Sequence, residues 1–237
     1  MKSIVLLKLI LLSPLFLIAQ EVEYPKSFLE KMPLYDVALG DFKYQISSNN
    51  EIAQTYFSQG FQMMYAFTKV DAARSFREAQ KADPNCAICY WGEAWAWSSY
   101  LNGAMKTSEA PRAYEKIQEA IGKAKKNGSK KEKDIIKAFS IRYVKDFDPD
   151  TRAIQDTLYS IEMEKLTSKY PDDLDIATLY AESLFLLEPR RGTRDVNDPD
   201  VDKLHSVLED ILEKDIKHPG ACHLYIHATE STQNPEW

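Results

Sequence analysis

The chain has 237 residues, a formal net charge of −6 and a pI near 5.4. This acidic balance argues against nucleic acid as a partner, because binding to phosphates depends on clustered Lys and Arg side chains. The length allows a sizeable core in one or two domains.

The chain begins MKSIVLLKLILLSPLFLIAQ, with Lys2 ahead of an apolar run and Ala19 ahead of a polar segment. This pattern is typical of a secretory signal peptide, which we expect at residues 1–19. Lys8 and Pro14 interrupt the run, and no later segment is long and apolar enough to cross a bilayer. We therefore expect an exported protein, periplasmic or secreted, without an integral membrane span.

Residues 20–48 show turn-rich pieces such as YPKSF and KMPLYD, and we expect them to be irregular. Helical periodicity dominates afterwards, whereas strand-like alternation is nearly absent. Ser129 and Glu132 have the spacing of a capping box at the start of one helix. The expected helices are two within 50–82, then 85–101, 109–126, 130–145, 151–169, 173–187, 201–215 and a last one from Pro219.

The paired helices contain an internal repeat of about 34 residues, the period of a tetratricopeptide repeat (TPR). Small residues let two helices approach closely, and a bulky residue fills the gap between repeats. The pattern predicts an all-α fold over 49–237: a right-handed solenoid of antiparallel helix pairs, with degenerate TPR-like repeats and a concave groove. The match is clearest in the first unit and weaker further on; the repeat-signature residues are Gly60, Ala72, Phe76, Ala79, Pro84 and Ala94.

The chain also resembles a group of exported bacterial proteins with degenerate tetratricopeptide repeats. Three stretches carry the resemblance, which runs from about residue 50 to the end: FSQGFQMMYAFTKVDAARSFREAQKADPNCAICYWGEA, YPDDLDIATLYAESL and HPGACHLYIHATESTQNPE. Members of the group usually continue with helices that carry a second histidine-rich motif, so we expect this chain to be a fragment or a shortened member that lacks the C-terminal half. The group has no assigned reaction, and the resemblance implies fold and export.

The stretch HPGACHLYIHATE holds three of the four histidines. On a helix, His223, His227 and Glu230 lie at i, i+4 and i+7 and share one face. Two imidazoles and a carboxylate suit zinc or another divalent ion, and His218 is a possible further ligand. The same side chains could instead hydrogen-bond the backbone of a neighbouring helix. A metal-binding protein or metalloenzyme is therefore the alternative function.

Cys86 and Cys89 form a C-x-x-C pair at a helix start, and Cys222 makes the cysteine count odd. A redox role would come with a βαβ context, which is missing. A structural disulfide and a packed pair of thiols both remain open.

Five aromatic residues cluster in YWGEAWAWSSY, namely Tyr90, Trp91, Trp95, Trp97 and Tyr100, and the first four are the candidates for lining a ligand groove. Most of this surface must be core between repeats, and a part that faces the concave groove could hold a ligand. The leading functional hypothesis is an exported TPR-like scaffold that binds a peptide or protein partner in its groove. No catalytic residue is assigned, because neither a Gly-rich phosphate loop nor a serine nucleophile motif occurs.

Overall fold

The computed structural model describes residues 24–35, 39–188 and 193–233. Within these ranges the protein is all-α, as predicted, with nine α-helices and no β-strand. The predicted signal peptide at 1–19 lies outside the described residues. The α-helices are α1 (Glu51–Tyr65), α2 (Lys69–Ala82), α3 (Ala87–Trp97), α4 (Ala110–Ala124), α5 (Lys130–Ser140), α6 (Arg152–Lys169), α7 (Leu174–Phe185), α8 (Pro199–Lys214) and α9 (Pro219–Thr229), with 3-10 turns at Lys26–Leu29 and Pro149–Thr151.

Side-chain caps define several helix starts. The predicted capping box is present at α5, where Glu132 donates its backbone N–H to Ser129 Oγ and the Glu132 carboxylate accepts the backbone N–H of Ser129. Asn50 caps α1 by accepting the amides of Ile52 and Ala53. None of the helices in the described part of the chain combines the length and the hydropathy that a membrane span requires.

Two helices end earlier than their periodicity predicts. The expected helix 85–101 ends at Trp97, because Ser98 turns back and donates both its backbone N–H and its hydroxyl to the Trp95 carbonyl. The expected helix 130–145 ends at Ser140. Beyond it, Arg142 and Tyr143 lie in a buried turn, where Arg142 donates to the Ser99 carbonyl at 2.7 Å.

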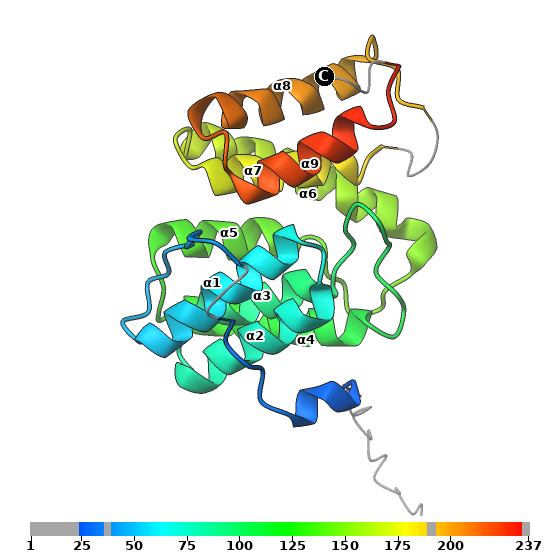
Figure 1. Cartoon of the computed structure of the whole chain (residues 1–237). Helices are drawn as coiled ribbons and strands as arrows, with labels where there is room; N and C mark the ends of the chain where they lie inside the picture. The colour runs from blue at the N-terminus through cyan, green and yellow to red at the C-terminus, as the bar shows by residue number, and fades with distance from the viewer. Residues whose placement is uncertain (1–23, 36–38, 189–192, 234–237) are drawn as a thin grey trace, which may run out of the picture.

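Consecutive helices pack against each other along the chain, and α9 returns to contact α1. Figure 1 shows α1–α5 as one group and α6–α9 as a second group stacked on it. The contact between α9 and α1 brings together residues far apart in sequence, because Gly220 on α9 lies directly against the Tyr65 ring; Tyr65 also donates its hydroxyl to Asp175 on α7 at 2.8 Å. The last helix is therefore part of the wall around the inner face of α1.

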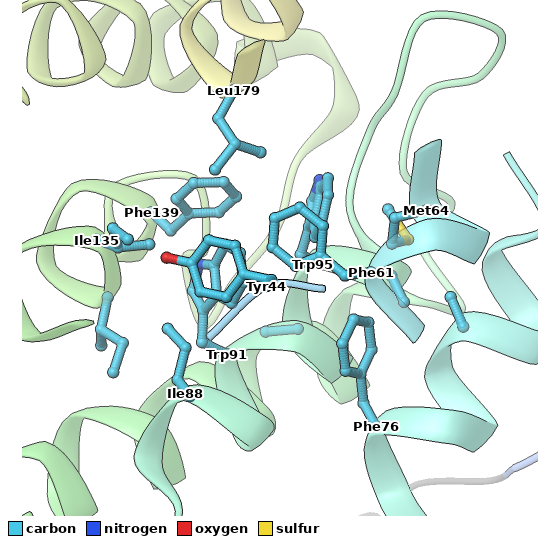
Figure 2. Close-up of a cluster of buried hydrophobic side chains, with 14 of the residues drawn as sticks. Tyr44, Phe61, Met64, Phe76, Ile88, Trp91, Trp95, Ile135, Phe139 and Leu179 are labelled. Atoms are coloured by element: carbon cyan, nitrogen blue, oxygen red, sulfur yellow. The ribbon is translucent and has the colours of Figure 1, made fainter. Parts of the chain in front are cut away.

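The core is a continuous aromatic cluster. Trp91 and Trp95 stack at 5.3 Å between ring centroids, and Phe139 meets Trp91 edge-on at 4.9 Å. Figure 2 shows Leu179 of α7 reaching down to this cluster from the second group of helices. Side chains therefore fill the inner face between α3 and α7.

The repeat-signature residues lie where two helices approach closely. Phe76 is fully buried, and its ring fits against Gly60 on α1 and Gly92 on α3. A Cβ at Gly60 would lie 2.8 Å from this ring, and one at Gly92 only 2.5 Å. The remaining small positions, Ala72, Ala79 and Ala94, are fully buried, and Pro84 lies in the turn between α2 and α3.

Candidate functional site

Two of the predicted metal ligands lie side by side on α9. The imidazole rings of His223 and His227 are 4.8 Å apart between centroids, and their Nε2 atoms are separated by 3.1 Å. Glu230 lies one turn further, with Oε1 2.5 Å from His227 Nδ1. The structure therefore brings His223, His227 and Glu230 together on one face.

The pair of histidines is anchored to the end of α1. His223 Nδ1 lies 2.5 Å from the backbone carbonyl oxygen of Tyr65. The Phe67 ring packs against both imidazoles, at 4.2 Å from His223 and 5.6 Å from His227. Phe67 has a φ of 59°, a left-handed conformation that is costly for a bulky residue and is held here by its surroundings.

His218 lies apart from this pair and caps the start of α9. Its Nδ1 accepts the backbone N–H of Ala221 at 3.2 Å, and its Nε2 lies 3.3 Å from Asp175 Oδ1. The ring is buried against Phe42 and Tyr65. In the part of the chain that the structure describes, no group of three or more His, Cys, Asp or Glu side chains is arranged to hold a metal ion.

An open hollow of about 530 Å³ lies beside the histidine pair, between the start of α2 and the chain segment 96–109. Backbone hydrogen bonds shape its wall: Tyr100 and Gly103 exchange N–H···O bonds at 2.9 and 3.1 Å. Apolar, aromatic and charged side chains line it. Its lining includes Phe67, Lys69, Val70, Asp71, Trp97, Tyr100, Lys106 and Glu109.

Lys69 is the most perturbed cation of this hollow. Its Nζ donates to the Ser98 carbonyl at 2.5 Å and lies 4.6 Å from the centre of the Tyr100 ring. Burial lowers the pKa of Lys69 to about 8, against the opposing attraction of Glu109. The Lys69 ammonium is therefore poorly solvated at the wall of the hollow.

A second, narrow cavity continues inward from the hollow. Phe67 and Tyr100 line both spaces, and Glu182 of α7 lies at the inner one. The indole N–H of Trp95 donates to both carboxylate oxygens of Glu182, at 3.3 and 3.2 Å. Burial raises the pKa of Glu182, while Arg142 opposes this shift. A buried carboxyl group, that of Glu182, therefore lines this narrow cavity.

The predicted aromatic candidates divide between core and cavity. Trp91 is fully buried in the aromatic cluster, and the Tyr90 ring lies 4.4 Å from Lys123 Nζ, away from the hollow. Trp95 lines the narrow cavity and Trp97 lines the hollow. Sequence reasoning missed Lys69, Phe67 and Glu182, since they belong to no motif and meet only through the tertiary fold.

Cys86 and Cys89 form a disulfide bond at the start of α3, with 5.4 Å between their Cα atoms. This pairing is one of the two alternatives that the spacing left open. Cys222, on α9, is a free thiol.

Comparison of the chain with protein-family models, with curated proteins and with solved structures gave no match.

Proposed function

We propose that the protein is an exported scaffold of TPR-like helix pairs that binds an extended segment of a partner protein. The close approach of α1, α2 and α3 around Phe76 supports the repeat register, because small residues occur at each contact point. The apolar N-terminal run supports export, and so does the Cys86–Cys89 disulfide, since disulfides persist in oxidising compartments.

The observation that carries the binding proposal is the hollow beside α2. Its volume of about 530 Å³ falls within the range of roughly 300–1,000 Å³ found for ligand sites. Phe67, Trp97 and Tyr100 offer apolar and aromatic surface, which suits a side-chain anchor.

Charges of both signs surround this aromatic surface. Lys69 and Lys106 are cationic, whereas Asp71 and Glu109 are anionic, and Lys106 and Glu109 pair at 3.7 Å. A peptide segment carries backbone donors and acceptors together with an apolar side chain, and it matches such a mixed lining better than a wholly apolar ligand does. We place the partner here rather than on the inner face, which side chains fill.

The test is selection of binders from a random peptide library, followed by comparison of two matched variants. Val70 lies in the first turn of α2, is 45% exposed and lines the hollow. Ile52 lies in the first turn of α1 and is 59% exposed. Val70→Arg should weaken peptide binding at least tenfold, because it adds bulk and charge at the rim, whereas Ile52→Arg should leave binding unchanged.

Two results would contradict the proposal. One is a library that yields no binder. The other is a set of binders whose affinity falls equally in both variants or in neither, because their site would then lie elsewhere.

The alternative function, divalent-metal binding, rests on a different observation, the histidine pair of α9. Metal binding by this pair does not depend on a peptide bound in the hollow.

A further inference from the structure

The hydrogen-bond partners of the two imidazoles determine where their protons lie. The Tyr65 carbonyl can only accept, so His223 Nδ1 carries a hydrogen and donates it. The Glu230 carboxylate likewise accepts, so His227 Nδ1 carries a hydrogen. A neutral imidazole has one N–H, and both Nε2 atoms are therefore left as bare lone pairs.

These two lone pairs meet at a distance of 3.1 Å. Two acceptors this close repel each other unless a cation lies between or beside them. In a tetrahedral zinc site with Zn–N bonds of about 2.0–2.1 Å, two ligand nitrogens are about 3.3 Å apart. The spacing observed here is close to that value.

The partners of Nδ1 also match a metal site. Histidines that ligate a metal nearly always donate their other ring N–H to a carboxylate or a backbone carbonyl, which fixes the tautomer and the ring orientation. Glu230 does this for His227, and the carbonyl of Tyr65 does it for His223. Phe67 packs on both rings and limits their rotation.

The helix that carries the pair is held at both ends. His218 caps its start, and Arg194 donates to the His227 carbonyl at 3.1 Å near its end. The His227 side chain is 22% exposed and that of Glu230 is 54% exposed, so the site opens to solvent on one side. Water can therefore reach the coordination positions that the protein leaves free.

We propose that His223 and His227 bind one divalent late first-row transition-metal ion, such as zinc, through their Nε2 atoms. Glu230 and the Tyr65 carbonyl orient the two ligands, and water or a donor from a bound molecule fills the other positions. Imidazole favours such ions over Mg²⁺, which prefers oxygen ligands. The ion would link α9 to the end of α1 through His223.

The experiment is calorimetric titration of the full chain, carrying no affinity tag, with ZnCl₂ and separately with MgCl₂. We expect one Zn²⁺ per chain and no Mg²⁺. His227→Gln should abolish zinc binding, because one imidazole remains. Glu230→Gln should weaken binding about 10–100-fold, the usual effect of losing an orienting partner.

Cys222→Ser is the matched control, because Cys222 is a free thiol beside His223 and is itself a possible zinc ligand. It should bind zinc as the wild type does. Binding that is lost in Cys222→Ser, or kept in His227→Gln, would overturn the assignment.

A measurement on the wild-type protein avoids any loss of folding in the variants. In ¹⁵N spectra of the imidazoles, zinc should shift the Nε2 signals of His223 and His227 and leave those of His205 and His218 in place. His205 Nε2 is engaged 3.1 Å from the Ala228 carbonyl, and His218 is engaged at the helix cap. Absence of any zinc-dependent shift would overturn the proposal in favour of a proton shared between the two rings.

Discussion

Phe76 fills the space that two glycines leave open. Its ring meets Gly60 on one side and Gly92 on the other, closer than any Cβ would allow. Phe76→Ala should lower the free energy of unfolding by about 3–5 kcal/mol, because it leaves a large cavity among rigid helices. Chemical denaturation measures this value. An unchanged unfolding midpoint would contradict the repeat register.

The opposite change, adding a side chain at a glycine that faces Phe76, tests the same packing. Gly92→Ala places a Cβ 2.5 Å from the Phe76 ring and should cost about 1–3 kcal/mol through overpacking. Gly122 lies inside α4, and a Cβ added there would meet no neighbouring atom within 4 Å, so Gly122→Ala should instead stabilise the protein by about 0.5–1 kcal/mol. Combining Gly92→Ala with Phe76→Leu should recover part of the loss. Equal effects of the two glycine substitutions would contradict this packing.

Lys69 gives a prediction about pH. Its pKa is lowered to about 8 in the folded protein, whereas the unfolded chain keeps the proton up to about 10.5. Between these values the unfolded state binds more protons, so the contribution of Lys69 to stability rises with pH. The unfolding free energy of the wild type minus that of Lys69→Met should therefore increase from pH 7.5 to pH 10. A difference that stays flat would show that Lys69 is not desolvated.

At the scale of the helices, sequence patterns predict those features that depend on residues close together in the chain. The capping box of Ser129 and Glu132 was predictable because its two partners are three residues apart and act within one turn. Phe76 was predictable as a core residue because the repeat pattern places a bulky side chain among small ones. Helix ends were harder, since Ser98 stops α3 through its own side chain while the apolar pattern runs on.

Contacts between distant helices could not be predicted in this way. The bond between His223 and the Tyr65 carbonyl joins residues 158 positions apart, and it depends on how α9 returns to α1. Spacing along one helix showed that His223, His227 and Glu230 share a face. It could not show that His218 turns away to cap the helix, or that Lys69 and Tyr100 meet at the hollow.

The N-terminus and the cysteines give predictions about signal-peptide removal and disulfide formation, which one measurement can test. Protein recovered from outside the cytoplasm should begin at Gln20, because the signal peptide is expected to be removed after Ala19. Alkylation should add one group before reduction, on Cys222, and three afterwards, since Cys86 and Cys89 are paired. Intact mass spectrometry reads both results. Three groups before reduction would contradict the disulfide, and an uncleaved N-terminus would contradict the predicted signal peptide.

At the scale of the whole molecule, helices α6–α9 stack on helices α1–α5 (Figure 1), and the open hollow lies between the start of α2 and segment 96–109. A rival surface exists on α6, where Ile154, Leu158 and Ile161 are exposed at helical spacing. Nothing in the described residues indicates what would cover that stripe, whereas the hollow combines a volume of about 530 Å³ with aromatic surface and charge. The hollow is therefore the better candidate for the partner site.

The most direct test of peptide binding in the hollow is hydrogen exchange, measured on the protein with and without a peptide selected from the library. If the partner binds in the hollow, backbone amides in segments 67–71 and 96–109, which form it, should exchange more slowly, and exchange along α6 should not change. Protection centred on α6, with the hollow unaffected, would contradict peptide binding in the hollow.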